Sequence, residues 1–201
     1  MIRTFHKLDS QGALHPERLG RFTASVATDL FMGKKSAGYN DVIDAVVAER
    51  WTGKTPSDRY YGGYMERGHE LEPFNVEQYE IDTFSTVTDG GFWTCGDWWG
   101  ASPDGCVDPD GLFEGKALKY TTHMRVLRTA ELPKKFLWQP PMQMLVSDRD
   151  WVDFSCFHPD LPPYRVRVNR DEKTEAKLIN ELEIAQQEAE KRLEELGKRY
   201  G

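Results

Sequence analysis

The stretch Ala101–Lys119, ASPDGCVDPDGLFEGKALK, combines a tight turn with a short apolar segment. Asp104 lies in a Ser-Pro-Asp-Gly turn, and the triplet from Glu114 to Lys116 begins ten residues later. The proline and glycine residues between them are typical of a connection between two strands. Side chains alternate between the two faces of a strand, so a strand over Leu112–Leu118 would place Glu114 and Lys116 on the same side. The hairpin would then bring Asp104 next to both.

Two carboxylates and an amine at one place form the PD-(D/E)xK pattern of many metal-dependent nucleases. A phosphodiester is already anionic, so it repels an attacking hydroxide, and its leaving oxygen needs charge neutralisation. Mg²⁺ meets both needs, and it binds through carboxylate oxygens while it keeps several waters. Asp104 and Glu114 are therefore candidate metal ligands, and Lys116 is a candidate to orient or deprotonate the attacking water. The alternative is a surface hairpin with scattered charges, because the bare pattern is short and common.

Length and composition are those of a globular protein. The 201 residues, of which 39% are hydrophobic, favour one domain over residues 1–201 with a sizeable core. The sequence has no signal-peptide-like or membrane-spanning apolar run, which indicates a cytosolic protein. The three cysteines, Cys95, Cys106 and Cys156, are odd in number and lack a C-x-x-C pair. This argues against a disulfide framework, a zinc site and an iron–sulfur cluster.

The net charge of −7 is unevenly distributed along the chain. Asp171–Arg199 contains nine acidic and six basic side chains, whereas Lys116–Lys135 contains six basic side chains and one acid, Glu131. The second segment includes Lys119, a candidate DNA contact. A locally basic groove on an acidic protein is compatible with a nucleic-acid partner, although the total charge neither supports nor excludes one.

The N-terminal part of the chain contains candidate phosphate ligands. Residues 1–15 are expected to be irregular, and a short helix is expected over Val26–Phe31, with a serine or threonine just before it as N-cap. Arg18, Arg21 and Ser25 lie around the predicted start of this helix. Helix N-termini bind phosphates through free N–H groups and the helix dipole, so these residues are candidate DNA contacts. The alternative is an ordinary capped surface helix.

The remaining pattern predicts a sheet flanked by helices. Helices are expected over Asp41–Trp51 (capped by Asn40), Tyr64–Tyr79, Thr121–Arg128 and Lys135–Val146, with a polar loop over Thr55–Gly63. Strands are expected over Thr83–Thr88, Gly91–Cys95, Trp98–Ser102, Trp151–Cys156 and Tyr164–Val168, in addition to the hairpin. The final helix, Asp171–Tyr200, has apolar residues at spacings of three and four, which is typical of a helix that packs on its own domain. The fold class is therefore α/β, with a central mixed β-sheet flanked by helices and a long C-terminal helix.

Five motifs, in their order along the chain, resemble the lambda exonuclease (YqaJ-type viral recombinase) family. They are Arg18-Leu-Gly-Arg-Phe-Thr-Ala-Ser25, Met65-Glu-Arg-Gly68-His-Glu-Leu-Glu72-Pro, Ser102-Pro-Asp104-Gly, Glu114-Gly-Lys116, and Gln139 followed by Met142-Gln-Met-Leu-Val. The similarity extends over roughly Arg18–Phe154, most of the chain. It implies a restriction-endonuclease-like PD-(D/E)xK core.

The resemblance also implies an activity and its partners. The activity is that of a magnesium-dependent 5′→3′ exonuclease, a phosphodiester hydrolase that processively digests one strand of linear double-stranded DNA. The resulting 3′ single-stranded tails would serve phage recombination by single-strand annealing. The implied partners are DNA ends, two further copies of the chain in a toroidal homotrimer, and a single-strand annealing recombinase, with no membrane. The implied location is the cytoplasm of a bacterial host, as a phage or prophage protein.

Carried over motif by motif, the resemblance implies two Mg²⁺ ions in the site, with Mn²⁺ as a substitute. Asp104 would bind both ions. Glu114 and the carbonyl of Gly115 would bind one of them, and Glu72 would bind the other. Glu70 is the alternative to Glu72, because both carboxylates lie in the same acidic run and only the neighbouring motif residues favour Glu72.

The same comparison implies roles for residues outside the metal site. Lys116 and Gln139 would act on the attacking water, and Arg18 with Ser25 would bind the 5′-phosphate. One departure from the family pattern is Pro140-Pro141 directly after Gln139, where relatives more often continue a helix. This departure leaves the orientation of Gln139 open.

Two other functions share some of these features. A restriction-type or repair endonuclease would use the same core, but it would not require a free 5′ end. A catalytically inactive DNA-binding recombination module would keep the fold without the chemistry. The intact Asp104, Glu114 and Lys116 argue against the inactive module.

Overall fold

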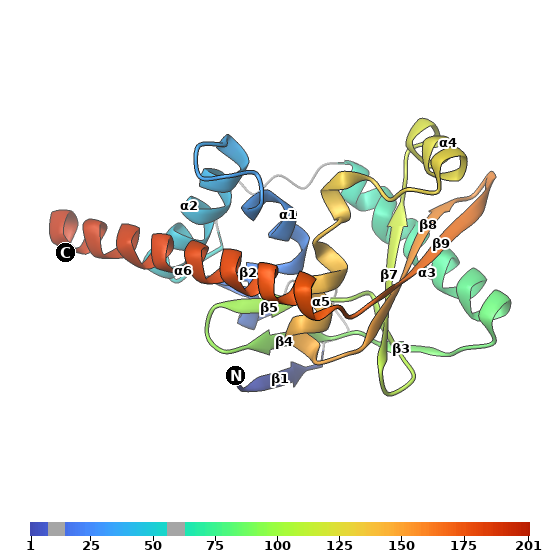
Figure 1. The fold of residues 1–201 in the computed structure, drawn as a ribbon, viewed down its shortest axis with the longest axis horizontal. Helices are drawn as coiled ribbons and strands as arrows, with labels where there is room; N and C mark the ends of the chain where they lie inside the picture. Colours follow the sequence, from blue (N-terminus) through green and yellow to red (C-terminus); the bar gives the residue numbers. More distant parts are fainter. Residues whose placement is uncertain (8–14, 56–62) are drawn as a thin grey trace.

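The computed structural model of the protein describes residues 1–7, 15–55 and 63–201, with only the backbone at residues 63–67 and 69. The described strands form two sheets, one with four strands in the order β1-β4-β5-β2 and one with five in the order β3-β6-β7-β8-β9. Figure 1 shows the two sheets side by side, with the long helix α6 passing along the four-stranded sheet. The predicted α/β class with mixed sheets and a long C-terminal helix is confirmed. In the described part of the chain, no helix is both long enough and apolar enough to span a membrane.

The four-stranded sheet contains two strands that the sequence analysis missed, at Arg3–His6 and at Phe22–Thr23. Its members are β1 (Arg3–His6), β4 (Phe92–Cys95), β5 (Trp99–Ala101) and β2 (Phe22–Thr23), with β2 parallel to β5 and the other pairs antiparallel. The prediction that residues 1–15 are irregular is therefore wrong at Arg3–His6, and residues 8–14 lie outside the described part. Strand β1 forms because it pairs along β4, about ninety residues away in sequence. Phe5 also packs on Trp93, with ring centroids 4.8 Å apart.

The five-stranded sheet contains the predicted hairpin. Its strands are β3 (Val87–Asp89), β6 (Gly105–Val107), β7 (Gly111–Ala117), β8 (Trp151–His158) and β9 (Leu161–Asn169). Strands β6 and β7 are antiparallel, whereas β7 and β8 are parallel, which makes the sheet mixed. Each predicted strand is present, with its ends shifted by a few residues.

Helices α2 (Ala37–Thr52) and α6 (Glu172–Tyr200) enclose the main apolar core with α1 (Ala27–Leu30). The stripe predicted on the last helix is buried at Leu178, Leu182, Ala185 and Ala189. Asp171 caps α6 by accepting a hydrogen bond from the Thr174 N–H. Asn40 does not cap α2, because the helix begins three residues earlier, where Ser36 accepts from the Tyr39 N–H.

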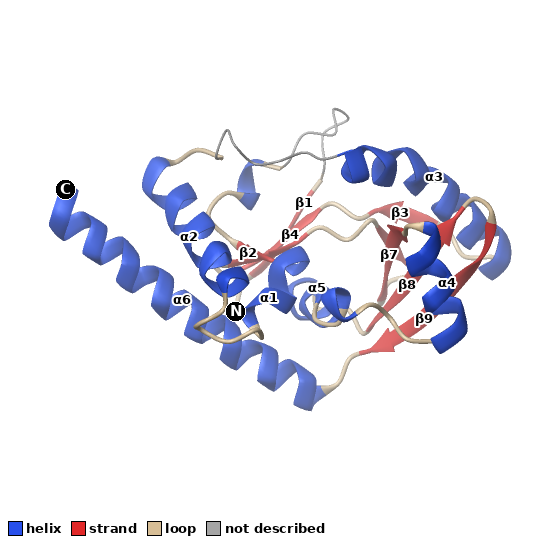
Figure 2. Ribbon diagram, turned by 90° about the horizontal axis from the view of Figure 1, so that it is seen from above, coloured by secondary structure: helices blue, strands red, loops and turns tan. Residues whose placement is uncertain are grey.

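Helix α5 (Gln139–Ser147) lies between the two sheets, as Figure 2 shows, and it contacts strands of both. The helix predicted over Lys135–Val146 is thus divided into a short 3₁₀ turn, Lys134–Phe136, and α5. Pro140 and Pro141 occupy the first turn of α5, where N–H groups have no intrahelical acceptor, so they do not disturb it.

Two further helices cover the five-stranded sheet. Helix α3 (Gly63–Thr83) extends beyond the predicted Tyr64–Tyr79 at its C-terminal end and continues through Pro73. Helix α4 (Tyr120–Thr129) matches its prediction. The predicted loop over Thr55–Gly63 lies mainly at residues 56–62, outside the described part. Strand β7 therefore has α3 on one face and α5 near the other, and this position determines the geometry of the site.

Candidate active site

The β6–β7 hairpin brings together the three residues on which the sequence prediction depends. Glu114 and Lys116 lie on the same face of β7, where the Lys116 ammonium forms an ion pair with Glu114 Oε1. Asp104 lies just before β6, and its Oδ2 accepts a hydrogen bond of 2.7 Å from the Gly115 N–H. The alternation of side chains along the strand thus places two carboxylates and an amine in one cluster, as predicted.

Helix α5 completes the surroundings of Glu114. The Nε2 atom of Gln139 donates to Glu114 Oε1, and the Nε2 atom of Gln143 donates to Glu114 Oε2, each at 2.5 Å. Glu114 is only 1% exposed, so these amides and Lys116 take the place of its hydration. The open question about Gln139 is therefore answered: its amide points to Glu114 although two prolines follow it. Gln143 was missed, although its spacing of four from Gln139 predicts the same helix face.

A cleft of about 690 Å³ opens above this cluster. Its lining includes Asp104, Gly115, Lys116 and Gln139 together with Glu72, Asn75 and Phe136. Ser25, Lys119, Thr122 and Lys135 also line it. Glu72 is half-buried in this lining, whereas Glu70 is exposed and does not reach it. The geometry therefore favours Glu72 over Glu70 as the third carboxylate.

Burial acts in opposite directions on the pKa values of Asp104 and Lys116 at the cleft floor, but the neighbouring charges leave both values raised. Burial, reinforced by the negative charge of Glu114, raises the pKa of Asp104 well above its usual range. Burial alone would lower the pKa of Lys116, but attraction to Glu114 and Asp104 outweighs it, so that pKa is raised. The amine is therefore protonated, and the cluster carries more carboxylate than its single ammonium can compensate.

The donor set of the cleft fits a hard divalent cation. Glu72, Asp104 and Glu114 provide carboxylate oxygens, the type of ligand that Mg²⁺ prefers. Among the residues that the structure describes, no three acidic, histidine or cysteine side chains are close enough to hold one ion together. An ion would therefore be bound by fewer carboxylates and complete its shell with a backbone oxygen and water, as Mg²⁺ commonly does. A cation would also relieve the repulsion that raises the pKa of Asp104.

Gly115 allows α3 to pack closely against β7. A Cβ atom on Gly115 would lie 2.6 Å from Asn75 Nδ2, too close for any side chain without movement. Asn75 is buried and exchanges two hydrogen bonds with Ser155 on β8, at 2.7 and 3.3 Å. This pair attaches the turn of α3 that carries Glu72 to the sheet. Sequence analysis missed Asn75, whose spacing of three from Glu72 was the available signal.

Arg18 and Ser25 are adjacent, and Arg21 points elsewhere. The Arg18 Nη2 atom donates to Ser25 Oγ at 3.2 Å and to Thr23 Oγ1 at 3.3 Å. Arg21 instead donates to the Gly96 carbonyl at 2.6 Å and does not line the cleft. Helix α1 has only four residues, so the expected phosphate site at a helix N-terminus has no helix long enough to form it.

The loop that carries Arg18 is held by helix α2. The Gly20 N–H donates to Glu49 Oε2 at 2.8 Å, and Arg50 Nε donates to the Gly20 carbonyl at 2.7 Å. Gly20 has a φ of +68°, and a Cβ atom there would lie 2.6 Å from the Arg50 side chain. Arg50 also stacks on Trp98, with its guanidinium carbon 3.4 Å from the ring centroid. These contacts fix the backbone position from which Arg18 reaches Ser25.

Comparisons with known proteins identify the family. A family model described as the YqaJ-like viral recombinase domain matches residues 14–150. The crystal structure of an alkaline exonuclease, LHK-Exo, from Laribacter hongkongensis is similar at 30% identity and a TM-score of 0.81, covering 90% of this chain and 94% of that one. LHK-Exo in complex with dAMP matches at 30% identity and a TM-score of 0.84, covering 92% and 95%.

Two other results complete these comparisons. A phage-related exonuclease from Haemophilus somnus 129PT has a TM-score of 0.68 at 13% identity, covers 88% of this chain and 96% of that one, and supports the fold alone. No curated protein matches this sequence. The family that the five motifs resemble is confirmed.

Proposed function

This chain belongs to the YqaJ-like viral recombinase family, and we propose that it is a magnesium-dependent 5′→3′ exonuclease that digests one strand of linear double-stranded DNA. The observation that carries the proposal is that Asp104, Lys116 and Gln139 line one cleft, and that Lys116 and Gln139 both contact the buried Glu114. The similarity to an alkaline exonuclease at 30% identity supports the same reaction class. Its product would be a duplex with a 3′ single-stranded tail, a substrate for recombination by strand annealing.

The proposed metal ligands are the carboxylates of Glu72, Asp104 and Glu114 with the Gly115 carbonyl. We propose two Mg²⁺ ions, with Asp104 between them and Mn²⁺ as a substitute. Bound Mg²⁺ would supply charge neutralisation for the phosphodiester and the leaving oxygen. Among the side chains of the cleft, Lys116 is the cation beside these carboxylates, and it compensates part of their charge.

Lys116 and Gln139 are the residues that would position the attacking water. Both donate to the same oxygen, Glu114 Oε1, so their polar ends converge on one point at the cleft floor. The Lys116 ammonium donates to Glu114 Oε1, and attraction to Glu114 and Asp104 outweighs burial and raises its pKa. Of the two roles that the sequence left open, we propose orienting the water, because the amine already lies in place as a hydrogen-bond donor. The amide oxygen of Gln139 can accept a hydrogen bond from the same water.

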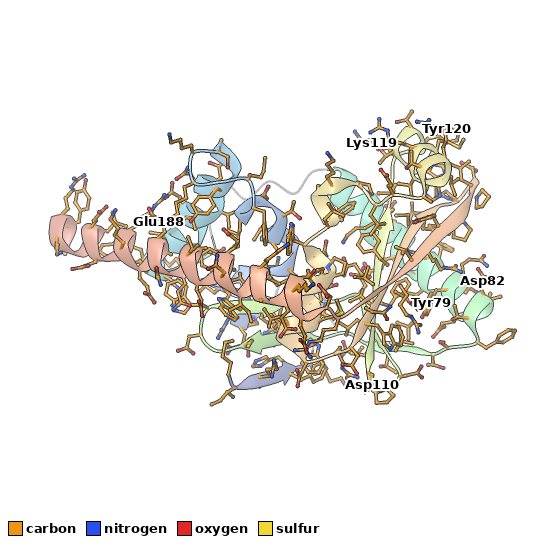
Figure 3. All side chains as sticks on the ribbon, in the orientation of Figure 1. Tyr79, Asp82, Asp110, Lys119, Tyr120 and Glu188 are labelled. Carbon is orange, nitrogen blue, oxygen red and sulfur yellow. The ribbon has the colours of Figure 1, made fainter. Side chains whose placement is uncertain are left out.

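Arg18 and Ser25 are proposed to bind the 5′-phosphate. Ser25 lines the cleft and accepts a hydrogen bond from Arg18, so a phosphate at this edge would meet both side chains. Lys119, directly before α4 and labelled in Figure 3, and Lys135 line the same cleft. They are proposed contacts for the DNA backbone. A homologue crystallised with dAMP supports a nucleotide as the ligand of this cleft.

One assay separates the proposed exonuclease from its alternatives. Linear duplexes with 5′-phosphate or 5′-hydroxyl ends and a covalently closed circular duplex are incubated with Mg²⁺ or with EDTA. We expect digestion of the linear duplexes from their 5′ ends, faster with the phosphate, and no change in the circle. Cleavage of the circle would indicate a restriction-type or repair endonuclease. Binding to DNA without digestion of any substrate would indicate an inactive recombination module.

The proposed partners extend the same function. We propose a single nuclease domain over residues 1–201, three copies of which form a ring around the duplex and deliver the 3′ tail to a single-strand annealing recombinase. Sedimentation equilibrium of the purified chain tests the assembly. A trimer mass supports the ring, and a monomer mass across the micromolar range contradicts it.

A further inference from the structure

We infer that Gln143 is a positioning residue for the reaction, which fixes the carboxylate of Glu114 so that its Oε1 atom faces the cleft. The inference rests on the proposed function, in which Glu114 is a metal ligand. No motif of the sequence analysis assigns a role to Gln143. The structure assigns one through its burial, its single partner and its place on α5.

The two oxygens of Glu114 have different surroundings. Oε1 accepts hydrogen bonds from Lys116 and Gln139, both of which line the cleft. Oε2 accepts from Gln143, which is 0% exposed and does not line the cleft. The partners of one oxygen therefore line the cleft, whereas the partner of the other oxygen lies in the protein interior.

Gln143 holds this oxygen at a cost to its own hydrogen bonding. Its Oε1 atom is buried and has no hydrogen-bond partner among the residues that the structure describes. A buried amide oxygen without a donor is unfavourable, and an apolar side chain of similar length would avoid that cost. The reverse orientation of the amide would place its oxygen against Glu114 Oε2, where neither atom can donate, so Nε2 must face Glu114. A purely packing role would be better served by methionine or leucine, which indicates that the donor end is the reason for a glutamine here.

The backbone of α5 directs Gln143 at its target. Gln139 and Gln143 are one helical turn apart, so both amides reach Glu114 from the same face of α5. The Ser147 hydroxyl donates to the Gln143 carbonyl at 2.7 Å and adds a contact in the last turn. The terminal torsion of a glutamate is broad and roughly two-fold, so the carboxylate turns easily unless both oxygens are held. Gln143 donates the hydrogen bond that holds the second oxygen, Oε2.

The decisive variant is Gln143→Met, which keeps the length and removes the donor. Residues that orient a metal ligand typically affect metal affinity or activity by roughly 10–100-fold. We expect kcat on linear duplex to fall by that factor while KM for DNA stays within about twofold. Calorimetric titration of the DNA-free protein with Mg²⁺ should show binding weakened by about tenfold or more. The unfolding temperature should change little, because losing the hydrogen bond to Glu114 Oε2 and removing the unpaired amide oxygen act in opposite directions.

Met144→Leu is the matched control, because Met144 is buried on the same helix but packs in an apolar cluster away from Glu114. It should leave kcat and Mg²⁺ binding unchanged. Gln143→Leu repeats the test should Gln143→Met fail to fold. Unchanged kcat and Mg²⁺ binding in a folded Gln143 variant, or a fall in unfolding temperature alone, would overturn the inference. Absence of nuclease activity in the wild type would defeat the proposed function instead, and the Mg²⁺ titration would still test Gln143.

Discussion

Helix α5 separates a region of apolar side chains from a region of buried polar side chains. Toward α6 it contributes Met142, Leu145 and Val146 to a core of aliphatic and aromatic side chains, which we call the α6 core. Toward β7 it presents Gln139 and Gln143 to a buried carboxylate, and we call these residues with Asp104, Glu114 and Lys116 the polar bed. The same nine-residue helix thus contributes apolar side chains to one region and hydrogen-bond donors to the other.

The difference shows where stability and chemistry are located. Each side chain of the α6 core gains free energy from leaving water, and its neighbours only need to fill space. Each group of the polar bed loses hydration on burial and needs a partner of matching geometry. Substitutions in the first region should therefore change stability, and substitutions in the second should change turnover. The predictions below test that division, beginning with the largest effect.

Asp104→Asn should abolish activity and raise stability together. Losing a metal ligand removes several kcal/mol of transition-state stabilisation, or about a 10³-fold fall in kcat/KM. Burial and the charge of Glu114 raise the pKa of Asp104, so at neutral pH this carboxyl group makes folding less favourable, which is a free-energy cost. The neutral amide removes this cost and can still accept from the Gly115 N–H. Single-turnover digestion with Mg²⁺ and thermal unfolding in EDTA at pH 7 measure the two effects.

The most specific part of this prediction is the sign of the stability change and its dependence on pH. A group whose folded pKa is raised costs stability above its unfolded pKa, so the gain of Asp104→Asn should vanish toward pH 3. An unfolding temperature below that of the wild type at pH 7 would mean that the Asp104 carboxylate stabilises the fold. The polar bed would then share the role of the α6 core.

Leu182→Ala should show the opposite behaviour. Leu182 is fully buried in the α6 core, and truncating a buried leucine costs about 2–5 kcal/mol. Urea unfolding should show that loss, while kcat per folded molecule at low temperature stays within about twofold. Leu137→Ala is a suitable control, because Leu137 is half exposed and its loss should change stability by at most about 0.5 kcal/mol. A large fall in kcat for Leu182→Ala under folding conditions would show that the two regions are coupled through α5.

Arg18→Ala should have a smaller and more selective effect. The Arg18 guanidinium can bind a terminal phosphate through two hydrogen bonds, and hydrogen bonds to charged groups contribute about 1.5–3 kcal/mol. The rate advantage of 5′-phosphorylated over 5′-hydroxyl ends should therefore fall by roughly 10–100-fold. Arg21→Ala is the control, because Arg21 donates to the Gly96 carbonyl, whereas Arg18 donates to Ser25 at the edge of the cleft. Equal losses on both kinds of end would make Arg18 a general DNA contact or a structural residue.

The sequence predicted those parts of the fold and site whose signals are local. The turn at Asp104 and the alternation in β7 are local, so the cluster of Asp104, Glu114 and Lys116 followed from spacing alone. The last helix followed from its apolar stripe and from Asp171 at its start. Strand β1 did not, because in the described part of the chain it pairs with β4 alone, and no residue between Arg3 and His6 encodes that pairing.

Polar contacts between distant elements were the other limit. Gln143 and Asn75 resemble ordinary helix residues until α5 and α3 are packed against the sheet, and only then do Glu114 and Ser155 become their partners. Asn40 illustrates the reverse error, because its preference for helix caps is satisfied within α2 by donating to the Lys34 and Ser36 carbonyls. Local signals therefore located Asp104, Glu114 and Lys116, but not Gln143 and Asn75, which reach their partners only through the packing of distant elements.

Tyr79→Phe tests whether a polar contact of the five-stranded sheet stabilises the fold outside the cleft. Tyr79, labelled in Figure 3, lies on α3 and donates to Asp153 Oδ2 at 2.6 Å. Arg167 donates two hydrogen bonds to Asp153, at 2.7 and 2.8 Å, so the carboxylate still has hydrogen-bond partners when the Tyr79 hydroxyl is removed. We expect a loss of about 1 kcal/mol by urea unfolding, the usual net value of one hydrogen bond, with unchanged kcat. A loss as large as that of Leu182→Ala would place this contact on a par with the α6 core.

The pH dependence of the same variant tests the origin of that small effect. Burial, and then the hydrogen bond to Asp153, raises the pKa of Tyr79 above its ordinary value near 10. A raised folded pKa contributes stability that is fully present below pH 10 and is lost as the pH rises toward the folded value. The stability difference between the wild type and Tyr79→Phe should therefore be constant from pH 6 to 9 and shrink above pH 10. The other tyrosines are common to both proteins and cancel in the difference, so a gap that stays constant above pH 10 would show that the Tyr79 hydroxyl contributes through packing and not through its bond to Asp153.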